Sequence, residues 1–163
     1  MKSFHLETKI NAPIHRVFDL ARSIDLHIEG AAHSSEKAIE GLVHGLVEVD
    51  DQIKWQAKHF GLTMTMRVKI TSIDLPNNFA DEMIEGPFVF FRHLHEFVAN
   101  GQITTMADNL QFEAPFGVIG SITESLFLKR HLFNFLRTKN QLIKKIAEGG
   151  DYQKYLNIER CVI

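Results

Sequence analysis

The residues best suited to chemistry in this sequence are two histidines and one aspartate in a predicted β-hairpin. His93 and His95 precede the dipeptide Asn100-Gly101, and Asp108 follows it. Asn-Gly between two β-rich runs favours a tight hairpin turn, because both residues tolerate a positive φ. If these two residues form the loop, His93 faces Asp108 across the hairpin. An imidazole beside a carboxylate suits general-base chemistry.

The alternation of side chains along the two strands gives the hairpin one apolar face that also holds these three polar residues. In that register His95 faces Met106 and Phe91 faces Leu110. Successive side chains of a strand point to opposite faces. The face toward the core then carries Phe91, His93, His95, Phe97, Met106, Asp108, Leu110 and Phe112. A fully apolar wall would need no histidine or aspartate, so we predict the wall of a lined cavity.

Two interpretations of the His93–Asp108 pair are open. In the first, His93 is a general base for an acidic C–H of a keto substrate, and Asp108 orients its ring. In the second, the buried pair satisfies its own hydrogen bonding and holds the hairpin in register. The candidate catalytic residues are therefore His93 and Asp108.

The same histidines are also candidates for a metal site. Two histidines two residues apart on a strand share a face, and imidazole and carboxylate groups bind Zn or Fe. His93 and His95 would need further ligands, for which His59 and Asp108 are the candidates. However, His59 belongs to another predicted strand, and no metal-binding spacing motif is complete. We therefore expect neither a metal nor another cofactor.

The hydrophobic pattern predicts a strand, two short helices, a series of strands and one long helix. We predict strands at 3–10, 53–60, 62–72, 79–85 and in the two arms of the hairpin, and a strand with a bend within 38–49, which Gly41 and Gly45 interrupt. Helical spacing appears at 14–22, again after Ser23, and from a cap at Ser121 or Thr123 to about Glu148. A curved antiparallel sheet of about seven strands needs a cover for its apolar face, and the last helix is the only long amphipathic element. The predicted fold class is α+β, with a gap between sheet and helix that suits a ligand.

Length, charge and cysteine content narrow the functional classes. The 163 residues fit one domain with a true core, which we place at 1–150, followed by a tail at 151–163. A net charge of −2 argues against a nucleic-acid partner. The single cysteine, Cys161, allows neither an intrachain disulfide nor a cysteine-based zinc site.

The sequence has no signal-peptide pattern and no apolar run of membrane-spanning length. We therefore expect a cytoplasmic protein without stable membrane insertion. The sequence leaves the oligomeric state open, with a homodimer as one possibility. The role of the tail and of Cys161 is also open.

Phenylalanine is unusually frequent, with 13 copies against one Trp and two Tyr. Phe supplies apolar area without a polar group, and Met adapts to irregular spaces, so both suit an apolar pocket. The predicted ligand-binding residues are Trp55, His59, Met64, Met66, Phe91, His93, His95, Phe97, Met106, Asp108, Leu110, Phe112, Phe127 and Phe135.

Several short motifs resemble those of a known superfamily. They are Asn-Ala-Pro at 11–13, His-Phe-Gly at 59–61, Gly-Pro-Phe at 86–88, His-Leu-His-Glu-Phe at 93–97, Thr-Met-Ala-Asp at 105–108 and Pro-Phe-Gly at 115–117. Over residues 3–148 the chain resembles the START/Bet v 1-like (SRPBCC) superfamily, and within it the bacterial polyketide cyclase/dehydrase or cell-division-inhibitor-like branch. The resemblance implies a helix-grip fold with a deep apolar cavity between the sheet and the C-terminal helix. Members of the superfamily bind lipids, sterols, polyketides or hormones, and some are cyclases.

Three functions follow as hypotheses. The first is binding or transport of a small hydrophobic ligand, such as a lipid or polyketide, by apolar burial with a few orienting hydrogen bonds. The second is a cyclase or dehydratase with His93 as base and Asp108 as the orienting group. The third is a protein-interaction module with a collapsed core. A cavity whose floor brings His93, His95 and Asp108 into contact would favour the second over a simple binding role.

Overall fold

The fold was analysed in a computed structural model, which describes residues 1–115 and 122–163, with side chains given for 1–115 and 126–163. Its elements follow the predicted order closely. The predicted cap at Ser121 lies outside the described residues, as does the side chain of Thr123.

The described chain alternates short helices with a long run of antiparallel strands. The strands are β1 (Lys2–Ile10), β2 (Lys37–His44), β3 (Gln52–His59), β4 (Leu62–Asp74), β5 (Asn78–Glu85), β6 (Phe90–Asn100), β7 (Ile103–Glu113) and β8 (Cys161–Val162). The helices are α1 (Ile14–Ala21), α2 (Ile24–Gly30), the 3₁₀ turn η1 (Ala32–Ser34), α3 (Ile122–Glu148) and α4 (Gln153–Leu156).

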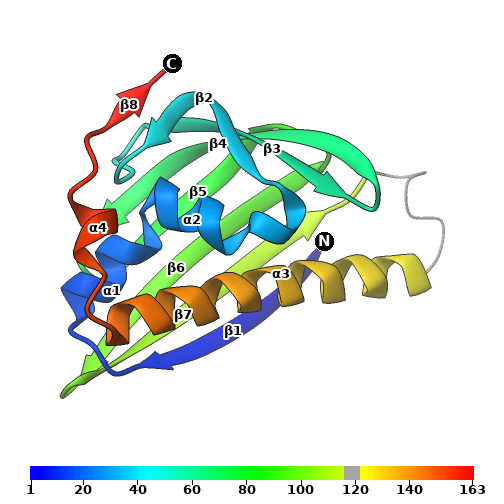
Figure 1. The fold of residues 1–163 in the computed structure, drawn as a ribbon. Coiled ribbons are helices and arrows are strands. Elements are labelled where there is room, and N and C mark those ends of the chain that lie inside the picture. The colour runs from blue at the N-terminus through cyan, green and yellow to red at the C-terminus, as the bar shows by residue number, and fades with distance from the viewer. Residues whose placement is uncertain (116–121) are drawn as a thin grey trace.

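The strands form one curved sheet in the order β1-β7-β6-β5-β4-β3-β2-β8. The register shifts between Ala38 and Glu40 in β2 and between Ile70 and Ser72 in β4. Such irregularities increase the local bend of a sheet. The sheet wraps around α3, with α2 between that helix and β2 and α1 at one end of the concave face (Figure 1). This is the predicted α+β helix-grip arrangement.

The register of the central hairpin differs from the predicted one by two residues. His95 lies opposite Asp108, and His93 lies opposite Leu110. The loop is Gly101-Gln102, since Asn100 pairs with Ile103. Of these two loop residues only Gly101 has a positive φ, of 62°, as in a turn with glycine at its first central position. The predicted pairing of His93 with Asp108 is therefore wrong. A shift of two residues preserves the face of every side chain, so the predicted inward face is retained.

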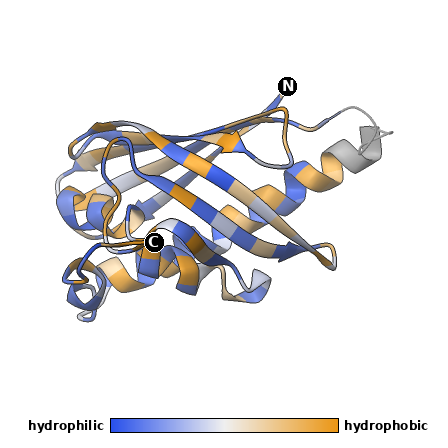
Figure 2. Ribbon diagram, turned by 90° about the horizontal axis from the view of Figure 1, so that it is seen from above, coloured by the Kyte–Doolittle hydropathy of each residue, from blue (hydrophilic) through white to orange (hydrophobic). Residues whose placement is uncertain are grey.

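The fully packed part of the core lies where α1 and the end of α3 meet the sheet. Phe18 of α1 is fully buried, and its ring lies 5.7 Å from that of Phe79 and 5.2 Å from that of Phe97. Hydrophobic and hydrophilic residues alternate along the strands, as expected for a sheet with one face inward (Figure 2). This end of the molecule is closed by side chains.

Helix α3 has 27 residues and is amphipathic. It packs mainly against β1, and Gly30 of α2 approaches it closely, since a Cβ added there would lie 3.2 Å from Cγ of Lys139. Among the described residues, no helix is long and apolar enough to cross a membrane.

The residues after Gly150, whose structure the sequence did not predict, pack against the rest of the chain. Tyr155 of α4 is 4% exposed, and its hydroxyl donates to Glu29 of α2 at 2.6 Å. Strand β8 pairs with β2, and the backbones of Ile163 and Gly41 exchange two hydrogen bonds. Arg160 binds both carboxylate oxygens of Asp51, at 2.8 and 3.0 Å. The tail thus adds an eighth strand to the sheet.

Candidate functional site

A cavity of about 660 Å³ lies between the concave face of the sheet and α3. This volume is within the range of about 300–1,000 Å³ that is typical of small-molecule sites. Its walls are mostly apolar and include Trp55, Met66, Phe91, Leu110 and Leu136. The collapsed core expected of a protein-interaction module is therefore not observed.

The structure brings most of the predicted ligand-binding residues to this cavity. Those on its lining are Trp55, His59, Met64, Met66, Phe91, His93, His95, Asp108, Leu110, Phe127 and Phe135.

Three other predicted residues, Phe97, Met106 and Phe112, do not line the cavity. Phe97 and Met106 are 2% and 1% exposed and belong to the cluster that packs against α1. Phe112, 1% exposed, is covered by Phe88, whose ring lies 5.9 Å away. They share the inward face, but neighbouring elements cover them.

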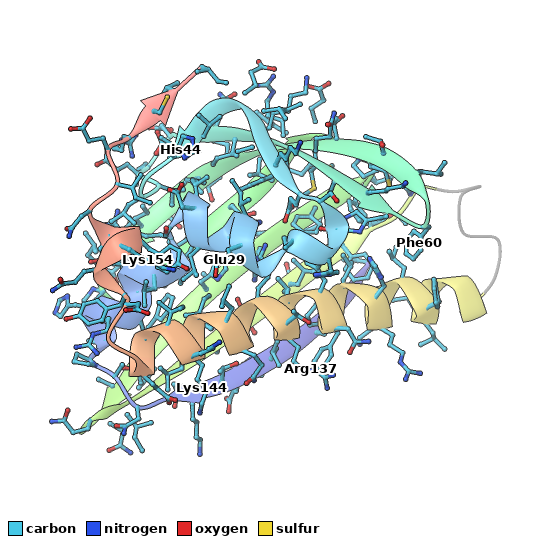
Figure 3. All side chains as sticks on the ribbon, viewed as in Figure 1. Glu29, His44, Phe60, Arg137, Lys144 and Lys154 are labelled. Carbon is cyan, nitrogen blue, oxygen red and sulfur yellow. The ribbon has the colours of Figure 1, made fainter. Side chains whose placement is uncertain are left out.

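The mouth of the cavity lies between the β3–β4 hairpin and the first turns of α3. Phe60, at the tip of that hairpin, lies above the helix (Figure 3). Its ring is 5.4 Å from that of Phe127, and more than half of each side chain is exposed. His59 and His131 are joined by a 3.1 Å hydrogen bond just inside. An apolar molecule would therefore meet aromatic rings on entering.

The floor of the cavity is polar, and three adjacent strands position it. The register places Asp81 of β5 opposite His93 of β6, and His95 of β6 opposite Asp108 of β7. Nε2 of His93 is hydrogen-bonded to Oδ1 of Asp108 at 2.9 Å, although the two residues are not cross-strand partners. Nδ1 of His95 lies 2.9 Å from the same oxygen. His93, His95 and Asp108 are thus in mutual contact.

Asp108 is the fixed centre of this group. Its side chain is 1% exposed, and its second oxygen accepts a hydrogen bond from Asn140 of α3 at 2.5 Å. Asn140 also donates to Thr8 of β1 at 3.3 Å. Because the partners of Asp108 lie on strands and a helix, the geometry is held by rigid elements.

Burial and the neighbouring charges set the protonation of the floor. Burial opposes the charged form of Asp108, yet His93 and His95 hold the pKa of this carboxyl well below its usual range. Burial also opposes a charged His95, but its contacts with Asp108 and Asp81 raise the pKa of His95 to about 9. Burial and the charge of His95 instead lower the pKa of His93 below its ordinary value. At neutral pH a protonated and a neutral imidazole therefore lie side by side.

The tautomer of His93 follows from its contact with Asp108. An ionised Asp108 can only accept, so Nε2 of His93 carries the proton of their hydrogen bond and Nδ1 carries the lone pair. Nδ1 of His93 and Nε2 of His95 lie 3.9 and 3.6 Å from Oδ1 of Asp81. Both nitrogens therefore approach the same carboxylate oxygen at the cavity floor.

A second polar group borders the same cavity. Glu36, Lys139 and His27 are all on its lining, and Nζ of Lys139 contacts both Nε2 of His27 and, at 3.8 Å, the carboxylate of Glu36. Burial opposes ionisation of Glu36, but the charge of Lys139 lowers its pKa to about 2. The ring of His27 stacks on Trp55 at 4.2 Å. The result is a buried ion pair beside the apolar wall.

Five polar residues of the site were not predicted from the sequence: Asp81, Glu36, Lys139, Asn140 and His27. A signal was present for some of them. Asp81 lies between Phe79 and Met83 on the inward face of β5, and Lys139 and Asn140 occupy a gap in the apolar stripe of α3. Glu36 lies in a loop, where no periodic pattern predicts which way a side chain points.

The metal ligands considered from sequence are not brought together as a set. His59 lies at the mouth, hydrogen-bonded to His131, whereas His93 and His95 lie on the floor. The residue that lies beside His93 and His95 is Asp81, and not His59 as predicted. One ligand atom from each of Asp81, His93 and His95 lies within 4.8 Å of the others.

Comparison with known proteins supports the fold. The chain aligns with the di-domain ARO/CYC StfQ from the steffimycin biosynthetic pathway at a TM-score of 0.73 and 12% identity, covering 90% of this chain and 50% of that one. It also aligns with TTHA0849 from Thermus thermophilus, at a TM-score of 0.69 and 18% identity, covering 87% and 97% of the two chains. The alignment with major latex-like protein 151 from Panax ginseng has a TM-score of 0.64 and 15% identity, and covers 91% of this chain and 98% of that one.

This chain has the Bet v 1-like helix-grip fold. No protein-family model and no curated protein sequence matches it. At these identities the alignments carry the fold and no residue roles.

Proposed function

We propose that this Bet v 1-like protein binds a small hydrophobic molecule with one polar oxygen, its apolar body against the walls and its oxygen toward the floor. The carrying observation is a cavity of about 660 Å³ with apolar walls and a polar floor around Asp108. Burial of apolar area, at about 25 cal/mol per Å², would supply most of the affinity. The protonated His95 and Lys139 would donate hydrogen bonds to a carbonyl or hydroxyl oxygen.

The proposal is tested by narrowing the cavity. Ala57 of β3 lines it, whereas Ala107 of β7 lies on the opposite face of the sheet. Ala57→Phe should weaken binding of the uncharged fluorescent probe N-phenyl-1-naphthylamine by about tenfold or more, a loss of about 1.4 kcal/mol. Ala107→Phe adds the same volume outside and should leave probe affinity unchanged. Equal affinities in the two variants would contradict an internal site, and native mass spectrometry of the purified protein would reveal any co-purified ligand.

A second candidate function is acid–base catalysis of the cyclase or dehydratase type. The observation that favours it is the contact of His93, His95 and Asp108 on the cavity floor. Asp108 orients His93 so that Nδ1 faces the cavity as a base, and the adjacent imidazolium of His95 can donate to the carbonyl oxygen of the same substrate. Proton removal next to a carbonyl is the step that such a pair would promote.

This candidate predicts measurable C–H exchange. The wild-type protein should accelerate deuterium exchange at the acidic carbon of an aromatic β-diketone, and His93→Gln should abolish the acceleration while the fold persists. Exchange is followed by proton NMR, and the fold by circular dichroism. His131→Gln, at the mouth of the same cavity, should retain the activity. An unchanged exchange rate in His93→Gln would rule out His93 as the base.

A further inference from the structure

The ring nitrogens of His93 and His95 that do not contact Asp108 face a second carboxylate on the cavity floor. Nδ1 of His93 and Nε2 of His95 lie 3.9 and 3.6 Å from Oδ1 of Asp81. At these distances neither nitrogen makes a hydrogen bond with Asp81 that meets normal geometry. Nδ1 of His93 carries a lone pair and faces Oδ1 of Asp81, so two hydrogen-bond acceptors lie opposite each other. A cation between them would satisfy both groups.

The spacing of the three atoms suits a metal ion. One ligand atom from each of Asp81, His93 and His95 lies within 4.8 Å of the others. Two donors bound to zinc at about 2.1 Å in tetrahedral directions lie roughly 3.4 Å apart, so small side-chain rotations would complete the coordination. Cross-strand pairing of Asp81 with His93, and the position of His95 two residues along β6, place all three on one rigid face.

The second nitrogen of each imidazole is also held as in metal sites. Asp108 lies 2.9 Å from Nε2 of His93 and 2.9 Å from Nδ1 of His95, and Asn140 fixes the carboxylate. Metal-binding histidines usually donate their other N–H to such a carboxylate, which fixes the tautomer and the ring orientation. Two buried carboxylates beside two imidazoles also provide a net negative environment that a divalent ion would neutralise.

We propose that Asp81, His93 and His95 bind a divalent first-row transition-metal ion whose remaining positions are open to the cavity. Two imidazoles and one carboxylate are the donor set of zinc enzymes and of non-haem Fe(II) sites, whereas Mg²⁺ and Ca²⁺ prefer oxygen ligands. The proposal replaces our sequence-based expectation of no metal and does not depend on the proposed ligand. A metal at this site would displace the proton from Nε2 of His95 and occupy the lone pair on Nδ1 of His93. Metal binding therefore excludes the acid–base use of the two histidines and hydrogen-bond donation by a protonated His95.

Metal binding can be measured directly on the untagged protein. After removal of metals with a chelator, it is titrated with Co²⁺, followed by the ligand-field absorption of the ion, and with Zn²⁺, followed by elemental analysis after dialysis. We expect one ion per chain. Asp81→Asn should weaken binding by roughly 100-fold or more, and Asp108→Asn, which removes only the orienting carboxylate, by roughly 10–100-fold.

The matched control is His131→Gln, which removes an imidazole from the His59–His131 pair in the same cavity. It should leave Co²⁺ affinity and spectrum unchanged. Zn²⁺ should raise the melting temperature of the wild type and of His131→Gln but not that of Asp81→Asn. Failure of the wild type to retain a stoichiometric ion, Co²⁺ affinity unchanged in Asp81→Asn, or Co²⁺ binding lost in His131→Gln would each overturn the proposal. Binding of N-phenyl-1-naphthylamine to the metal-free protein separately reports whether the ligand cavity functions.

Discussion

At the scale of single residues, several buried charged side chains line the cavity, and each needs a partner of opposite charge. Glu36 is 8% exposed and lies 3.8 Å from Nζ of Lys139. Burying a charge without a partner costs several kcal/mol, so removal of one member is expensive. Every buried side-chain nitrogen or oxygen among the described residues has a hydrogen-bond partner, which shows how completely these groups are compensated.

The Glu36–Lys139 pair gives a prediction for stability. Glu36→Gln should lower the free energy of unfolding at pH 7 by roughly 3–5 kcal/mol, because Lys139 would lose its buried counter-charge. Denaturant unfolding measures the change. The control is Glu85→Gln at the exposed ion pair with Arg67, which should change stability by about 0–1 kcal/mol. Similar losses of unfolding free energy in the two variants would mean that burial adds little to the contribution of the Glu36–Lys139 pair.

The same pair gives a pH dependence with a defined sign. The pKa of Glu36 is lowered from 4.5 to about 2 in the folded protein. Its stabilising contribution is therefore complete above about pH 4.5 and is lost as the pH falls toward 2. Between pH 5 and pH 3 the wild type should lose more unfolding free energy than Glu36→Gln. Parallel stability curves in this window would contradict the assignment.

At the scale of elements, the tail is part of the folded unit although the sequence assigned it no place. Tyr155 belongs to the same core cluster as Phe18 and Phe97, and β8 extends the sheet at β2. The strand itself has only two residues, so the tail is held chiefly by the buried Tyr155 and by Arg160 on Asp51. Its contribution to stability should thus be uneven along its length.

Two truncations separate these contributions. A chain ending at Gly150 should lose roughly 3 kcal/mol or more, because the space filled by Tyr155 would be left empty. A chain ending at Asn157 keeps α4 and loses only β8 and the Arg160 contacts, so it should lose about 1–2 kcal/mol. Thermal unfolding compares the two. Equal melting temperatures of the two truncated chains would show that α4 and Tyr155 add nothing to stability. A chain ending at Gly150 that melts at the temperature of the full chain would show that residues 1–150 suffice as the domain.

At the scale of the whole molecule, the cavity follows from wrapping a sheet around a straight helix. Helix α3 packs mainly on β1, while α1 and α2 close one end of the concave face. The space between α3 and strands β3–β6 remains, and its aromatic mouth lies at the other end (Figure 3). Protein cores are otherwise close-packed, and buried charges are costly there. A space with apolar walls and a charged floor is therefore typical of a binding site and not of a core. The shape of the molecule therefore supports the proposed ligand site.

The sequence by itself determined most of the elements before Gly150 and the faces of their side chains. Period-two alternation identified β1, β3, β4 and the hairpin, and it placed His93, His95 and Asp108 inward even though the register was wrong by two residues. These features depend on neighbours in the chain, where side-chain direction is fixed by backbone geometry.

Only the tertiary structure decided which of these residues meet. It paired Asp81 with the two histidines, moved His59 to the mouth, covered Phe97, Met106 and Phe112, and joined Glu36 to Lys139. These contacts join segments far apart in sequence, and their geometry comes from strand register and helix packing. Local hydrophobic patterns specify a face but not the partner across it.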